Sequence, residues 1–233
     1  MKKRILTSAL MAIATLAQAS TVNWGAQLDT VLLSSNPNNT TLLPTGSVIR
    51  LGYFNLTDVA IQGFHNAADF SSLNAAFTQY DFATSSEGSG LDGTFAKAST
   101  SAANLNGNLQ IFVWVLQSAN NSSVAQAVAT ATAQAIFYVD KAVNPEWNFP
   151  AVFNGVANVD IGDLTNPTGG AANGAHLVVG NFQANVARQD VRDAFGAARV
   201  EGIQVVAPVP EPTSAFLIAV GAAGLMMRRR RQS

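Results

Sequence analysis

Short apolar stretches, separated by polar turns, dominate the chain between residues 20 and 207. Each stretch is rich in Val, Ile, Phe, Tyr or Thr and is bounded by Gly, Asn, Pro or Ser, as β-strands are. Residues 111–116 (IFVWVL) are apolar at every position, which is typical of a central strand buried on both faces. The pattern predicts a mainly β fold, a single β-sandwich or barrel-like domain. Strands are expected within residues 26–35, 46–55, 93–102, 109–118, 133–140, 175–182 and 201–208.

Between residues 70 and 80, the apolar residues follow the period of a helix instead of the alternation of a strand. Asp69 stands where a helix N-cap is expected. Two further segments are candidates: 124–135, where alanine favours a helix but Val and Thr favour a strand, and 188–200. We therefore expect one or two short helices beside the sheet. The helical stripe after Asp69 consists of Phe70, Leu73, Phe77 and Tyr80.

The first 19 residues have the layout of a secretory signal peptide. Residues 2–4 are basic, residues 5–16 are apolar, and the small residues Ala17 and Ala19 precede Ser20. An amphipathic first helix of the fold would explain the apolar stretch but not the cleavage-like end that follows it. We predict cleavage between Ala19 and Ser20, with signal peptidase as the processing enzyme.

The other end of the sequence contains a second apolar stretch, residues 213–227, which carries no charge. It is shorter than the roughly 18–20 residues of a full membrane span, and a buried core helix is the alternative for this length. Prolines before it, glycines inside it and arginines after it favour a transmembrane helix. The arginines would be held on the cytoplasmic side, which gives an N-out, C-in topology. These membrane-orienting residues are Arg228, Arg229, Arg230 and Arg231.

The order of these features resembles the PEP-CTERM sorting signal. Val209, Pro210, Glu211 and Pro212 are followed by the apolar stretch and then by the arginine cluster. The resemblance implies that Pro210, Glu211 and Pro212 are read by exosortase, a membrane-embedded, transpeptidase-like protease that removes the anchor. It also implies a Gram-negative host that makes extracellular polysaccharide. The β-rich body is loosely similar to those of small PEP-CTERM proteins from Verrucomicrobia-type bacteria.

Three parts of the chain follow from this interpretation. Residues 1–19 are the signal peptide, residues 20–207 a β-rich extracytoplasmic domain, and residues 208–233 the sorting signal. The protein is expected to be exported, anchored in the inner membrane by its C-terminal helix, and then found on the outer surface or outside the cell after processing. Its partners would be the two processing enzymes, the membrane and extracellular polysaccharide.

Charge separates the body from its two ends. Only 12% of the residues are charged, against about 25% in typical soluble domains. Residues 20–207 carry six basic and thirteen acidic side chains, a net charge of −7, while each end carries +3. An acidic body argues against nucleic acid as a partner, because binding phosphates requires clustered Lys and Arg.

The sequence offers few groups for chemistry. The histidines, His65 and His176, have no G-x-S-x-G motif or metal-ligand spacing beside them. Asp160 and Asp163 could share Ca²⁺ in a loop, although acids beside glycine are ordinary turn residues. Glu146 beside a tryptophan is the most suggestive carboxyl for glycoside hydrolysis, and a turn glutamate is the simpler reading. The chain has no cysteine, which removes disulfides, thiolate catalysis and Cys-based zinc sites from consideration. We predict no catalytic residue, no metal site and no cofactor.

Three classes of function fit these observations. The first is a non-catalytic surface or extracellular-matrix protein, favoured by low charge and abundant Asn, Ser and Thr. The second is a carbohydrate-binding module, which would need a row of exposed aromatic side chains on one sheet face. The third, a secreted hydrolase, has the least support. Candidate sugar platforms for the second class are Trp114, Trp147, Tyr53, Tyr80 and Tyr138.

The signal-peptide prediction has a direct test. If Ala17 and Ala19 are the residues read by signal peptidase, N-terminal sequencing of the exported protein should give Ser-Thr-Val-Asn-Trp. A start at Met1 in the exported protein would contradict the prediction.

Overall fold

The computed structural model describes residues 20–26, 30–36, 41–101, 108–118, 123–150, 155–164, 174–183, 186 and 201–209. The strands in these ranges are β1 Ser20–Ala26, β2 Thr30–Leu33, β3 Val48–Phe54, β4 Phe77–Thr84, β5 Phe95–Ser101, β6 Phe112–Gln117, β7 Ala133–Val139, β8 Val156–Asp160, β9 Ala175–Val179, β10 Asn181–Gln183 and β11 Glu201–Gln204. The α-helices are α1 Asp58–Asn66, α2 Phe70–Ala76 and α3 Val124–Thr130, and the short 3₁₀-helices are η1 Pro145–Trp147 and η2 Ile161–Leu164.

A five-stranded antiparallel sheet in the order β4-β3-β6-β7-β9, the central sheet, forms the middle of the body. Its third strand is β6, which contains residues 112–116 of the stretch that is apolar at every position. Side chains alternate along a strand, so Val113 and Val115 point to one face while Phe112, Trp114 and Leu116 point to the other. Both faces are buried, which confirms the prediction of a central strand here.

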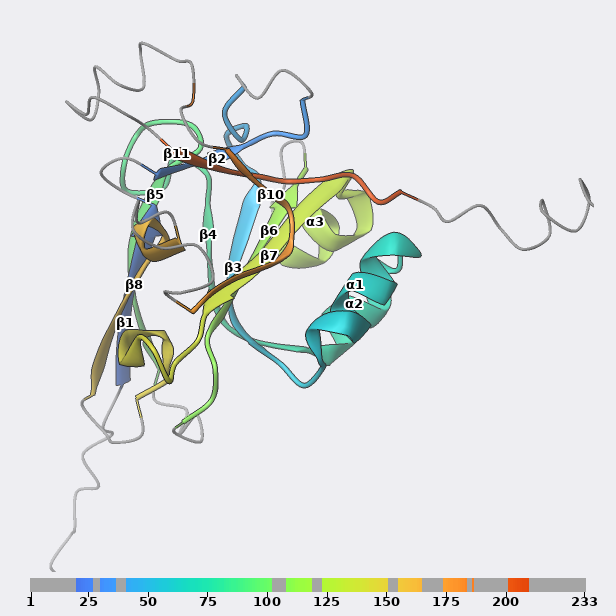
Figure 1. Ribbon diagram of the computed structural model, residues 1–233. Coiled ribbons are helices and arrows are strands. Elements are labelled where there is room, and N and C mark those ends of the chain that lie inside the picture. Colours follow the sequence, from blue (N-terminus) through green and yellow to red (C-terminus); the bar gives the residue numbers. More distant parts are fainter. Residues whose placement is uncertain are drawn as a thin grey trace, which may run out of the picture.

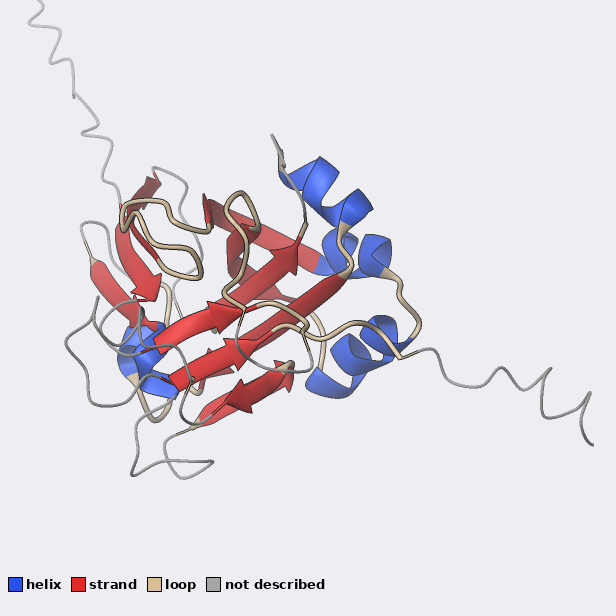
Figure 2. Ribbon diagram, turned by 90° about the horizontal axis from the view of Figure 1, so that it is seen from above, coloured by secondary structure: helices blue, strands red, loops and turns tan. Residues whose placement is uncertain are grey.

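The two faces of the central sheet are covered by different layers. One face packs on a three-stranded sheet in the order β5-β1-β8, the outer sheet, through a core that includes Trp24, Phe95 and Phe137. The other face packs on the three α-helices through Ile61 of α1, Leu73 of α2 and Ala127 of α3. Figures 1 and 2 show the three α-helices on one side of the body, and Figure 1 shows strands β1, β5 and β8 on the opposite side.

Parallel pairing brings segments that are distant in sequence into one fold. β1 lies in the middle of the outer sheet, antiparallel to β5 and parallel to β8. A small sheet in the order β10-β11-β2 pairs β11 with β2, again in parallel. Beyond β11, Val206 exchanges two backbone hydrogen bonds with Gln134 of β7, at 2.9 and 3.0 Å, and so joins the small sheet to the central sheet.

The mainly β prediction is confirmed, and each of the seven predicted segments contains a strand. The prediction missed β1, β4 and β8. It also expected one or two helices, whereas the described residues contain three α-helices; α1 was missed, and α3 lies in the ambiguous segment. The segment 188–200, the signal peptide and the predicted transmembrane helix lie outside the described residues.

The predicted helix after Asp69 is shorter than its apolar stripe. Asp69 caps α2 as expected, because its carboxylate accepts a hydrogen bond of 2.9 Å from the backbone N–H of Ser72. Placing Phe77 and Tyr80 on the same helix was wrong, because α2 ends at Ala76 and both residues belong to β4. Tertiary packing decides this: the Phe77 ring lies 4.7 Å from that of Phe54 and 5.4 Å from that of Trp114.

Gly52 allows this aromatic packing. The pairing of β3 with β4 shifts register between Leu51 and Gly52. A Cβ atom at Gly52 would lie 2.3 Å from the carbonyl oxygen of Thr78 and 2.6 Å from the Phe77 ring. The position therefore requires glycine for lack of space. Gly63 of α1 is a contrasting case, because a Cβ atom there would meet nothing within 4 Å.

We predict opposite effects for two Gly→Ala changes. Gly52→Ala should lower the free energy of unfolding by about 1–3 kcal/mol, the usual cost of overpacking. Gly63→Ala, the matched control on an exposed helix position, should raise it by about 0.5–1 kcal/mol, because alanine favours helix over glycine. Urea denaturation of the two variants and the parent protein measures both effects. Equal stability of the two variants would contradict the packing described here.

Candidate functional site

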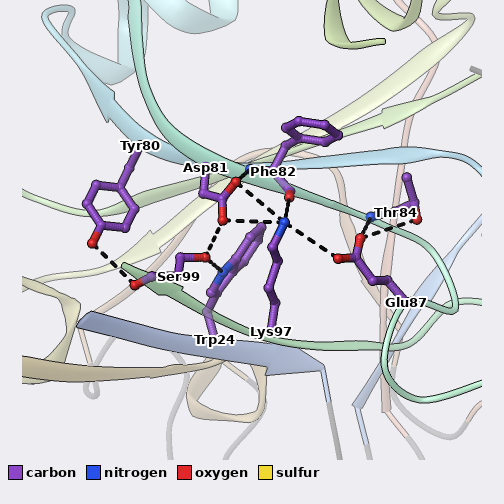
Figure 3. A network of polar contacts seen from close by, with 8 residues as sticks. All are labelled: Trp24, Tyr80, Asp81, Phe82, Thr84, Glu87, Lys97 and Ser99. Atoms are coloured by element: carbon purple, nitrogen blue, oxygen red, sulfur yellow. Dashed lines mark hydrogen bonds and ion pairs between the residues drawn. The ribbon is translucent and has the colours of Figure 1, made fainter. Parts of the chain in front are cut away.

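Within the described ranges, the largest group of charged side chains in contact with one another lies between the central and outer sheets, and Figure 3 shows it. Lys97 of β5 reaches across to β4, where its Nζ lies 3.3 Å from Asp81 Oδ2. In the turn after β4, Glu87 Oε1 lies 3.5 Å from the same nitrogen. Lys97 also donates a hydrogen bond to the backbone carbonyl of Phe82. One ammonium group therefore contacts two carboxylates and a carbonyl.

Asp81 connects this ion pair to the interior of the outer sheet. Its Oδ2 accepts a hydrogen bond of 2.5 Å from Ser99 Oγ, and Ser99 Oγ in turn accepts one of 2.8 Å from Trp24 Nε1. Trp24 and Ser99 are both buried. Tyr80 adds a further link, because its hydroxyl lies 2.8 Å from the carbonyl oxygen of Ser20. The Lys97 network thus ties β4 of the central sheet to β5 and β1 of the outer sheet.

The chemistry of this network is that of a cross-link. The Ser99 hydroxyl gives its proton to a carboxylate and accepts another from an indole, so it is not poised as a nucleophile. The Lys97 ammonium group is held between two carboxylates and a backbone carbonyl, so its contacts are all to groups of the fold. On the other face of the outer sheet lies an open hollow of about 440 Å³ over Asn23, Gly25 and Ala96. Asn23 and Asn158, partners on the neighbouring strands β1 and β8, both line this hollow and are hydrogen bonded to each other at 2.9 Å.

The two histidines lie in different places. His65 of α1 is buried, and its Nδ1 lies 2.9 Å from Gln134 Nε2. Trp114 Nε1 donates to Gln134 Oε1 at 2.7 Å, so the amide nitrogen of Gln134 must donate to His65. His65 Nδ1 is therefore an acceptor and the imidazole is neutral. Burial accordingly lowers the pKa of His65 below its ordinary value.

His176 of β9 is half-exposed and stacks on Tyr138 of β7, with ring centroids 4.5 Å apart. The Tyr138 hydroxyl donates to Asp58 Oδ2 at 3.1 Å. Burial, together with the negative charge of Asp58, raises the pKa of Tyr138. His176 Nδ1 lies 3.8 Å from the same Asp58 oxygen. These contacts fasten the start of α1 to the edge of the central sheet.

Asp160 and Asp163, the candidate calcium ligands, accept hydrogen bonds from neighbouring groups of the fold. Asp163 Oδ2 accepts hydrogen bonds of 2.9 Å from Trp147 Nε1 and from Asn144 Nδ2. Asp160 Oδ1 accepts one of 2.8 Å from the backbone N–H of Gly162. Glu146 is exposed in η1, while its neighbour Trp147 is fully buried. Within the part of the chain that the structure describes, no three His, Asp or Glu side chains are grouped as metal ligands would be.

The candidate sugar platforms do not form an exposed row. Trp114 and Trp147 are fully buried, and Trp114 lies in the core on the helix side of the central sheet. Tyr53, Tyr80 and Tyr138 are partly buried against the same two cores. The five candidate side chains thus form part of the hydrophobic cores or pack against them.

The predicted processing residues lie mostly outside the described ranges. Ser20 is described and begins β1, so the predicted cleavage would leave this strand whole. Ala17, Ala19, the sorting motif Pro210, Glu211 and Pro212, and Arg228, Arg229, Arg230 and Arg231 lie outside. Among the described residues, none of the helices is long and apolar enough to span a bilayer. The signal-peptide and anchor assignments therefore stay predictions.

Sequence reasoning missed the Lys97 network. A signal was present, because Phe95, Lys97 and Ser99 alternate with small residues in a strand-like stretch. This period places a lysine on the same, inward face as a phenylalanine, and a buried lysine needs carboxylate partners. The partners in β4 could not be named, because the helical stripe predicted from Phe70 to Tyr80 covers the first half of that strand.

Comparison with known proteins identifies the C-terminal segment. Residues 208–231 match the family model of the PEP-CTERM protein-sorting motif. The motif implies processing by exosortase, and an exported precursor anchored in a membrane. No curated protein and no solved structure matches the chain.

The contact between His65 and Gln134 predicts a pH dependence of stability. The folded state holds His65 neutral, with its pKa lowered by burial, so the unfolded state binds a proton more readily. The contribution of neutral His65 to the free energy of unfolding should be fully present above the ordinary histidine pKa of about 6.5. It should be lost progressively as the pH drops below that value. Urea midpoints measured from pH 8 to pH 5 follow this loss.

His65→Asn keeps an acceptor near the position of Nδ1 and cannot be protonated in this range. It should remove most of the pH dependence, whereas the control His176→Asn should leave it in place. The same slope in His65→Asn and in the parent protein would show that another group is responsible.

Proposed function

We propose that this protein is an exported, non-catalytic component of the cell surface or extracellular matrix of a Gram-negative bacterium. Its β-rich body is the delivered part, and the segment from residue 208 onward is the sorting signal that exosortase processes. The observation that carries the proposal is the match of residues 208–231 to the PEP-CTERM motif. A signal peptide at residues 1–19 is the companion that export through the inner membrane requires.

The connection between body and motif supports processing by a protease. Among the described residues, which end at Val209 here, Val206 is the last that the central sheet holds by backbone hydrogen bonds. Ala207 is exposed, and the side chain of Val209 is 75% exposed. A protease binds its substrate extended, and the prolines at 210 and 212 push their preceding residues toward extended backbone. The motif thus follows directly on a stretch of chain that is already accessible.

The division of charge supports the direction of anchoring. A tail of four arginines favours the cytoplasmic side, where anionic lipids attract it and where moving it across the bilayer is costly. The acidic body would then lie on the outer side of the inner membrane. Removal of the anchor would release a body that anionic lipid does not retain.

The polar groups of the body support a structural role over a catalytic one. Lys97, Asp81 and Ser99 hold one another, and Asp163 holds Trp147. A carbohydrate-binding module gains no support from the predicted platforms, because Trp114 and Trp147 are buried. We therefore propose delivery of a stable β-domain, with polysaccharide as its surroundings.

The role of the sorting motif can be tested by a single charge change. Glu211→Gln keeps both prolines and the apolar segment, so the protein should still be exported and anchored. If exosortase reads the carboxylate, the variant should be processed poorly. The measurement is the ratio of anchored, full-length protein to released, shortened protein in the native host. Glu146→Gln, the same change at an exposed glutamate of the body, is the matched control.

The result separates two explanations of the tail. A lower released fraction in Glu211→Gln alone would support recognition of the motif. Equal ratios in all three proteins would mean that the glutamate is not read and that the tail is an ordinary anchor. Changing Arg228 to Arg231 into Gln should instead disturb the orientation of the anchor, visible as a change in which side of the membrane a protease can reach.

A further inference from the structure

We infer that, in the anchored precursor, the helix-covered side of the body faces the membrane surface. The inference rests on the proposed function, because it requires residues 213–227 to be held in the bilayer. We call this side the helix face and define it by exposed side chains of α3 and of the α1 C-cap. These residues are Ala67, Ala125, Gln126, Ala129 and Thr130.

The chain leaves the body on this side. Val206 packs against the core that contains Ile61 of α1 and Ala127 of α3. Its hydrogen bonds with Gln134 fix it at the start of β7, a few residues after α3. Figures 1 and 2 both show the last described segment leaving on the side of the helices, away from β1, β5 and β8.

The tether between body and bilayer is short. Residues 207–212 separate Val206 from the apolar stretch, and six extended residues span about 20 Å at most. A domain of this size has a radius of gyration of about 16 Å, so it is about 40 Å across. Turning the outer sheet to the membrane would lift the exit point to about 40 Å, twice the reach of the tether. The exit side must therefore stay near the bilayer.

Charge does not separate the two sides of the body. α3 carries no acidic or basic side chain, but Asp69, the cap of α2, lines the same hollow as Ala125 and Ala129 of α3, and Asp58 begins α1. Asp160 of β8 and Glu146 of η1 are exposed on the side of the outer sheet. The short tether therefore decides which side stays near the bilayer.

The occupant of the helix face in this proposal is the lipid headgroup surface. Because the chain has no cysteine, a single introduced thiol can be labelled uniquely with a fluorophore. Ala129→Cys places the label on α3. The matched control Ala98→Cys places it on β5, at an exposed alanine of the outer sheet.

The experiment uses the full-length chain reconstituted in vesicles of phosphatidylethanolamine and phosphatidylglycerol that contain a lipid with a quencher on its headgroup. We expect loss of fluorescence from the label at position 129 and none from the label at position 98. Equal quenching at both positions, or stronger quenching at position 98, would overturn the inferred orientation.

A linker variant tests the cause. Inserting about 30 Gly and Ser residues between Ala207 and Pro208 gives a flexible tether of about 30 Å root-mean-square length. The body can then turn, so quenching at position 129 should fall toward that at position 98. Quenching that survives the insertion would overturn the tether argument. Failure of the unmodified chain to float with the vesicles would instead contradict the proposed anchor, so the two proposals can fail separately.

Discussion

Burial of the central sheet on both faces is the constraint on which the rest of the body depends. β6 cannot contact water on either side, because Val113 and Val115 pack on the outer sheet while Phe112, Trp114 and Leu116 pack beneath the helices. A sheet of this kind needs two covering layers, and neither layer can form a core without it. The aromatic cluster on the helix side explains why α2 ends before Phe77, which belongs to β4. It also explains why residue 52 is glycine.

The covering layers are held by polar contacts as well as by burial. On the outer-sheet side, the chain of hydrogen bonds from Trp24 through Ser99 and Asp81 leads to Lys97. On the helix side, Trp114, Gln134 and His65 form a second chain, in which each group has one possible role as donor or acceptor. In each chain a buried tryptophan N–H has a partner, so removing that partner would leave an unpaired donor in the core. These contacts fix one arrangement of layers that apolar packing alone would specify less well.

Strand content could be predicted from the sequence because seven apolar stretches are bounded by turn residues, and each of them contains a strand. The failures have physical causes. The stripe from Phe70 to Tyr80 fits a helix as well as a strand edge, and long-range contacts with Phe54 and Trp114 decide its second half. β1 and β8 pair in parallel across more than a hundred residues, which no local pattern shows. The sorting motif was found because its order along the chain carries the signal, whereas the Lys97 network requires knowing which strands are neighbours.

The few cations of the described body are all engaged within it. Arg50 is sandwiched between Phe77 and Trp114, with its guanidinium carbon 4.6 Å from each ring centroid, and it donates to Gln79 and Asn74. Burial lowers the pKa of Arg50 to about 10, so it remains charged at neutral pH. Lys97 is held by two carboxylates, and Lys141 donates to the carbonyl of Asn108. The basic side chains in the described ranges thus each contact groups of the fold itself. A body with a net charge of −7 has little electrostatic attraction to an anionic membrane, so in the proposed precursor retention would depend on the C-terminal segment, and processing by exosortase would remove that attachment.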